Sequence, residues 1–196
     1  QTIIGTPMSP VFPSGAESTV PVAPALSFDD INKKTRAALL NILCTTLRSG
    51  SFNPVSGSGV LIDPRGVILT NAHVAQYFLL KDYLVKDFVQ CVIREGSPAR
   101  NRYKAALLYI APQWIEQNAR KIISADQTGT GKHDFALLLI TESINPEAVP
   151  LPPSYPSIEL DTSDEAFRRK NPSILVAGYP AGFLGGINIQ KELYPV

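Results

Sequence analysis

Short apolar runs separated by turn residues recur along the first two thirds of the chain. The clearest pair consists of residues 60–62 and 67–69, which are apolar and rich in β-branched side chains. Between them, Pro64 presets φ and Gly66 accepts a positive φ, as a tight turn requires. Because β-branched residues favour strands, this stretch predicts two strands joined by a tight turn.

Four further segments have strand character: residues 40–47, 88–94, 103–110 and 134–140. In the second of them, Val89, Cys91 and Ile93 alternate with polar side chains, as in a half-buried strand. Together with the hairpin these segments make six predicted strands within about residues 40–140. Short, regularly spaced strands predict an all-β fold, either a small closed barrel or a sandwich.

Helical patterns are few and short. Ser27 is a favoured N-cap residue, and the aspartates that follow it suit the positive end of a helix dipole, so a helix is predicted over about 28–37. The residues after His73 predict a short helix that groups three apolar side chains, Tyr77, Leu80 and Leu84. A second short helical insertion is predicted to begin near Pro112.

Proline content indicates the domain boundaries, since the 17 prolines cluster at the start of the chain and again before residue 157. Residues 1–26 are predicted to form a flexible Pro/Ser-rich linker. Residues 27–144 hold the first helix and the six strands, and residues 145–172 are predicted to form an extended connector. Residues 173–196 begin a new strand, which is followed by the sequence GYPAG.

Composition excludes several classes of protein. The hydrophobic fraction of 44% is enough for a core. A net charge of +1 gives no basic surface, so we expect no nucleic-acid partner. No apolar run approaches the ~20 residues that span a bilayer, and no signal-peptide pattern is found. Because the chain begins at Gln1 without a methionine, we expect an upstream segment, with a membrane tether there as one alternative.

Two residues at predicted strand ends are candidates for catalysis. His73 follows the second strand of the hairpin, and Asp134 opens the apolar run DFALLLI. Imidazole is suited to general-base catalysis near neutral pH, and a buried carboxylate can orient it. The two residues therefore indicate half of a hydrolytic site. His133 is the competing histidine; it is predicted to face solvent because adjacent strand residues point to opposite faces.

The motifs GSGVLID, TNAHV and HDFALLLI resemble the trypsin-like serine proteases, most closely their bacterial HtrA-type branch. The resemblance covers roughly residues 40–183. It implies a six-stranded antiparallel β-barrel within residues 27–144 and the beginning of a second barrel at 173–196. It further implies a polypeptide substrate, no cofactor and no metal, with His73 as general base and Asp134 as its orienter.

The third catalytic element of this family is a serine in a G-x-S-G motif of the second barrel, and the chain contains no such motif. The Ser-Gly-Ser run at 56–58 precedes the histidine and is interpreted as a strand opener. The chain is therefore expected to be a fragment of a longer serine endopeptidase, inactive by itself, because removing the nucleophile costs about 10⁶ in turnover. Two alternatives stay open: a non-catalytic, protease-like binding module, and a cysteine protease with the same fold.

Two weaker motifs do not support other functions. The run GTGK at 129–132 is similar to a phosphate-binding loop, but Asp126 replaces its first glycine and His133 its final serine or threonine. The spacings of the two histidines and two cysteines fit no zinc-binding pattern. The sequence gives no indication of oligomeric state.

Cys44 and Cys91 lie on the apolar faces of the first and fourth predicted strands. In the family these two strands run side by side to close the barrel, but sequence alone does not establish their register. The cysteines are therefore either two buried thiols or a disulfide. A disulfide would indicate an oxidising compartment, in keeping with an extracytoplasmic protease that is periplasmic, secreted or membrane-anchored.

Overall fold

A computed structural model describes residues 27–46, 54–83, 85–122, 129–160, 173–180 and 188–193. The predicted linker at 1–26 and Leu84 lie outside the described residues. Among those that are described, no helix combines the length and apolar character needed to cross a membrane.

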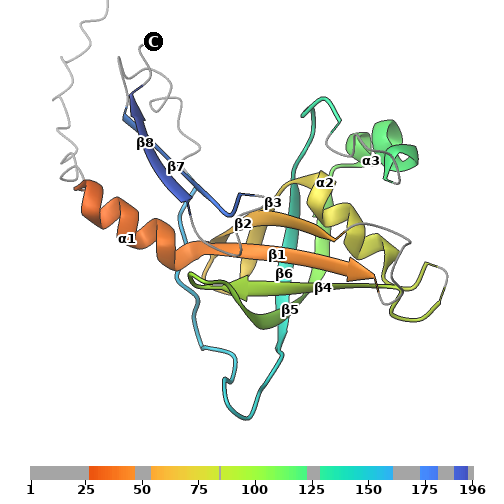
Figure 1. The fold of residues 1–196 in the computed structure, drawn as a ribbon, viewed down its shortest axis with the longest axis horizontal. Coiled ribbons are helices and arrows are strands. Elements are labelled where there is room, and N and C mark those ends of the chain that lie inside the picture. The colour runs from red at the N-terminus through yellow and green to blue at the C-terminus, as the bar shows by residue number, and fades with distance from the viewer. Residues whose placement is uncertain are drawn as a thin grey trace, which may run out of the picture.

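The first helix, α1 (Phe28–Ala38), begins where the sequence predicts it. Ser27 has extended backbone dihedrals, and its hydroxyl oxygen accepts a hydrogen bond from the amide of Asp30 at 3.1 Å. The helix ends at Ala38, and Leu39, with a φ of −83° and a ψ of 131°, starts the first strand directly. Helix α1 extends away from the barrel (Figure 1).

Within the described part of the chain, six strands form a closed antiparallel barrel in the order β1-β2-β3-β6-β5-β4 (Figure 1). The pairing of β4 with β1 closes it. This confirms the predicted barrel and excludes the sandwich. The strands are β1 (Leu39–Thr46), β2 (Val55–Asp63), β3 (Val67–Thr70), β4 (Val89–Glu95), β5 (Arg100–Ile110) and β6 (Ala136–Ser143).

The barrel interior is filled by apolar side chains, and burial alternates along β3 and the first part of β6, as in strands with one face toward a core. Five apolar strand residues have no solvent exposure, namely Ile42, Ile68, Ile93, Ala136 and Leu138. The predicted turn between β2 and β3 is confirmed. Gly66 there has a φ of +92° and donates its amide to the carbonyl of Asp63 at 3.0 Å.

The segment after β6 packs back onto the barrel. Residues 151–160 have no regular secondary structure, yet the amide of Tyr155 donates to Pro64 O at 2.9 Å and that of Ile158 to Leu61 O at 2.8 Å. The side chain of Tyr155 is 8% exposed and meets Tyr103 edge-on, with ring centroids 5.7 Å apart. No sequence pattern marks Tyr155 as a core residue.

The two cysteines form a disulfide across the seam that closes the barrel. Cys44 of β1 and Cys91 of β4 are direct partners in the strand register, with Cα atoms 4.0 Å apart. The alternative of two free thiols is therefore wrong. The bridge connects segments separated by 47 residues in sequence.

A two-stranded hairpin follows the barrel, made of β7 (Ser173–Gly178) and β8 (Asn188–Leu193) (Figure 1). The predicted strand at 174–177 lies within β7. Next to it, Tyr179 donates its amide to Ser58 Oγ at 2.8 Å and its hydroxyl to Gly96 O at 2.9 Å. These bonds attach the residue that follows β7 to β2 and to Gly96 of the barrel region.

Candidate active site

His73 lies on a short helix that leaves the barrel at the end of β3. Helix α2 (Ala72–Ala75) follows Asn71, and the 3₁₀-helix η1 (Gln76–Leu80) continues it. The sequence placed His73 at a strand end and the helix after it, whereas the histidine is the second residue of that helix. The helix packs closely on β2. The contact leaves no room for a side chain at Gly57 of β2, where an added Cβ would lie 2.5 Å from Cγ2 of Val74 on the helix.

Asp134 lies two residues before β6, in the segment that enters this strand. Strands β3 and β6 are paired, with Thr70 opposite Ala136. The residues just after β3 therefore meet those just before β6, although 61 positions separate His73 from Asp134 in sequence. Strand pairing thus brings together the two residues that the sequence selected.

The imidazole and the carboxylate are in direct hydrogen-bond contact. Nδ1 of His73 is 2.8 Å from Oδ2 of Asp134, and the backbone amide of His73 donates to Oδ1 at 2.9 Å. The His73 side chain is 25% exposed and that of Asp134 only 10%. Because an ionised carboxylate only accepts hydrogen bonds, Nδ1 donates its proton and the lone pair of Nε2 is free to take up another.

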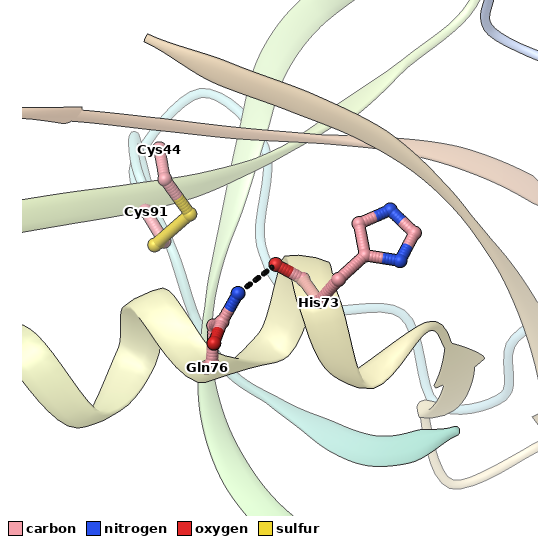
Figure 2. Close-up of a disulfide and its surroundings, with 4 residues drawn as sticks. All are labelled: Cys44, His73, Gln76 and Cys91. Atoms are coloured by element: carbon pink, nitrogen blue, oxygen red, sulfur yellow. Dashed lines mark hydrogen bonds between the residues drawn. A yellow bond between two sulfur atoms is a disulfide. The ribbon is translucent and has the colours of Figure 1, made fainter. Parts of the chain in front are cut away.

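The main chain around His73 is also held in place. Gln76, with 2% exposure, donates its side-chain amide to the carbonyl of His73 at 2.9 Å. Figure 2 shows this bond between the disulfide and the imidazole, with the ring pointing away from Gln76.

The fully buried ring of Trp114 lies on the predicted insertion, α3 (Pro112–Asn118), which η2 (Ala119–Lys121) extends. Its centroid is 6.4 Å from that of His73.

The competing histidine, His133, is exposed, as predicted, but the predicted reason is wrong. Neither His133 nor Asp134 is part of strand β6, so strand alternation does not apply to them. His133 instead has a φ of +57° in the turn before the strand. It is this turn that places the two neighbouring side chains in different surroundings.

The Ser-Gly-Ser run belongs to β2 and has structural contacts. Ser56 Oγ accepts a hydrogen bond from the side chain of Asn41 at 2.9 Å, and Ser58 Oγ accepts the amide of Tyr179 at 2.8 Å. These contacts agree with the interpretation of the run as a strand opener. They also explain why a polar sequence occurs on a strand of the barrel.

Two grooves lie near the elements of the candidate site, and one of them includes Asp134 in its lining. One has a volume of about 310 Å³ and is lined by Asn71, Asp134 and mainly apolar side chains, among them Leu69, Phe135 and Ala177. The other, about 380 Å³, is lined by η1 and the α3–η2 segment, including Gln76, Leu79, Ile115 and Ile122. In the described part of the chain, no three His, Cys, Asp or Glu side chains gather as metal ligands.

Asn71 was present in the TNAHV motif, but the sequence analysis assigned it no role. Its side-chain amide contacts both the carboxylate and the backbone carbonyl of Asp134, at 3.2 Å in each case. The only sequence signal for it is its position two residues before the histidine. No propensity or periodicity argument would have found it.

The comparison with protein families agrees with this geometry. The family model of a trypsin-like peptidase domain matches residues 57–191, a range that includes both His73 and Asp134. No curated protein matches the chain.

Proposed function

The chain belongs to the family of trypsin-like peptidases, and from that premise we propose that it is part of a serine endopeptidase that hydrolyses polypeptides by acyl transfer. The observation that supports this most strongly is the 2.8 Å contact between His73 Nδ1 and Asp134 Oδ2. It leaves Nε2 as the proton acceptor on a side chain that is one quarter exposed. We also propose the HtrA-type branch, on the basis of the GSGVLID and TNAHV motifs.

In the proposed reaction, Nε2 of His73 takes the proton of the serine hydroxyl as its oxygen attacks the scissile carbonyl carbon. The same nitrogen then protonates the leaving amine, and an acyl-enzyme remains. Water, deprotonated by His73 in turn, releases the acid product. Asp134 keeps the proton on Nδ1 and stabilises the imidazolium ion that forms at each step; these roles follow the family's own template.

The proposal assigns the nucleophile to a serine beyond residue 196. Within the barrel, Ser56 and Ser58 are engaged by Asn41 and by Tyr179. The polypeptide substrate is supported by two mainly apolar grooves, one lined in part by Asp134 and one by η1 and the α3–η2 segment, which are suited to peptide with apolar side chains. The oxyanion hole would accompany the nucleophile.

A fluorophosphonate probe tests the proposed function, because it labels only a serine that a neighbouring base activates. We expect it to label the full-length protein and to leave the 196-residue chain unlabelled. Labelling of the short chain would show that the nucleophile is misplaced. An unlabelled full-length protein would favour the protease-like binding module, and labelling by a thiol-directed active-site probe would favour the cysteine protease.

We further propose an extracytoplasmic location, with a membrane tether upstream of residue 1 as one arrangement. The disulfide between Cys44 and Cys91 supports it, since structural disulfides persist in oxidising compartments. Thiol titration of the unfolded, unreduced protein isolated from its native compartment tests it. We expect no free thiol; two free thiols per chain would contradict both the bridge and the location.

A further inference from the structure

Asn71 occupies the N-cap position of α2 but does not act as its cap. Its backbone is extended, with φ of −79° and ψ of 145°, and asparagine is among the most favoured N-cap residues. Its side chain nevertheless makes no capping bond. The amide nitrogen Nδ2 instead donates to Asp134 Oδ2 and to Asp134 O, at 3.2 Å each.

Asp134 has taken over the capping of the helix. Its Oδ1 accepts the backbone amide of His73, the second helical residue, which is one of the donors that an N-cap side chain would satisfy. Its Oδ2 accepts the side chains of His73 and Asn71. The carboxylate thus accepts three hydrogen bonds from a segment of three residues.

The backbone at Asp134 has little support from the barrel itself. Strand β6 begins only at Ala136, and the preceding His133 is in a left-handed turn whose carbonyl accepts the amide of Phe135 at 2.9 Å. The carboxylate is therefore placed by its contacts with the α2 segment. Asn71 is the residue that contacts both the main chain and the carboxylate of Asp134 with one amide group, which restrains both at once.

We propose that Asn71 is a positioning residue, which holds the Asp134 carboxylate against Nδ1 of His73 and so selects the Nδ1–H tautomer of the imidazole. The amide is suited to this because it donates a hydrogen bond without adding charge beside the carboxylate. The effect of Asn71 on turnover rests on the proposed peptidase function, whereas its effect on the tautomer of His73 does not. A correctly held tautomer leaves Nε2 free as the base.

The tautomer is measurable by ¹⁵N NMR of the imidazole ring at alkaline pH. The chain has two histidines, so His133→Gln leaves a single imidazole to observe. In this background we expect the Nδ1–H form to dominate. Asn71→Ser keeps a favoured N-cap residue but shortens the donor's reach, and should give a mixture with the Nε2–H form.

Asn71→Asp and Asn101→Ala make the NMR experiment decisive. Asn71→Asp also preserves capping, but it removes the donor and places a second carboxylate beside Asp134, so the Nδ1–H form should decrease further. Asn101→Ala removes an exposed asparagine of β5 and should change nothing. Circular dichroism verifies that each variant is folded. Retention of the wild-type tautomer in folded Asn71→Ser and Asn71→Asp would overturn the proposal.

Kinetics of the full-length protein test the catalytic consequence. Losing a hydrogen bond to a charged group should lower kcat about tenfold in Asn71→Ser, whereas Asn101→Ala should keep the wild-type kcat. A shifted tautomer with unchanged kcat would contradict that consequence. If the wild-type full-length protein hydrolyses no peptide, the proposed function fails, while the NMR result still decides the role of Asn71.

Discussion

Removing the disulfide perturbs the barrel at the point where it closes. Cys44 and Cys91 face each other in the register of β1 and β4, the pair that completes the cylinder. The variant to study is Cys44→Ala combined with Cys91→Ala. Alanine is preferred to serine because Cys44 is 2% exposed, and a hydroxyl there would add the cost of burying a polar group.

The magnitude follows from the length of chain that the bridge encloses. For a sequence separation of 47 residues, the chain-entropy model gives a stabilisation of about 4 kcal/mol at 25 °C. The unfolded chain, once freed of the cross-link, gains this conformational entropy. For a domain of this size the melting temperature should fall by about 10 °C.

Urea-induced unfolding, followed by the fluorescence of the single tryptophan, measures the difference in free energy. Wild-type protein in a dithiol reductant should unfold near the midpoint of the double-alanine variant. That variant serves as the matched control, because the reductant should not affect it. A loss of less than about 1 kcal/mol on removing the bridge would refute the entropic reasoning.

Two further predictions concern the turn between β2 and β3. Gly66→Ala should destabilise the barrel by about 2 kcal/mol, because Gly66 has a φ of +92° and the new Cβ would lie 2.9 Å from Tyr155 Cε2. Calorimetry measures this, and an unchanged melting temperature would contradict the close packing. Arg65→Ala should raise the pKa of Asp63 from about 2 part of the way toward 3.8, because the side-chain hydrogen bonds of Arg65, the largest cause of the lowered pKa, are lost while the backbone amide of residue 65 still donates. NMR titration of the carboxyl carbon checks this. The stability from this lowered pKa is present above about pH 4 and is lost as the pH falls toward 2, so the variant should lack the share that the Arg65 side chain contributes. A carboxyl pKa unaffected by the substitution would exclude the side-chain contact.

The strands could be predicted from sequence because each has a local signature. The alternation of Val89, Cys91 and Ile93 is a period-2 pattern, and Gly66 marks the turn that joins β2 to β3. Barrel closure was expected from the resemblance to the family. The disulfide stayed open, because the register of β1 against β4 depends on tertiary packing.

The site was predictable only in part. His73 and Asp134 could be selected by residue type and motif, and the pairing of Thr70 with Ala136 explains why they meet. The contribution of Asn71 could not be predicted, because its side chain donates hydrogen bonds to Asp134 on another segment instead of to its own helix. Tyr155 was missed for a similar reason, since a tyrosine in a proline-rich connector has no periodicity to mark it as buried.

The central claim is that His73 is the general base of a serine peptidase, and peptide hydrolysis by the full-length protein tests it most directly. The measurement compares kcat for His73→Ala and for His133→Ala, which removes the other histidine of the 196-residue chain, one that is exposed in the turn before β6. If His73 is the general base, kcat should fall by about 10⁶ in His73→Ala and stay at the wild-type value in His133→Ala. Wild-type turnover in His73→Ala would contradict it.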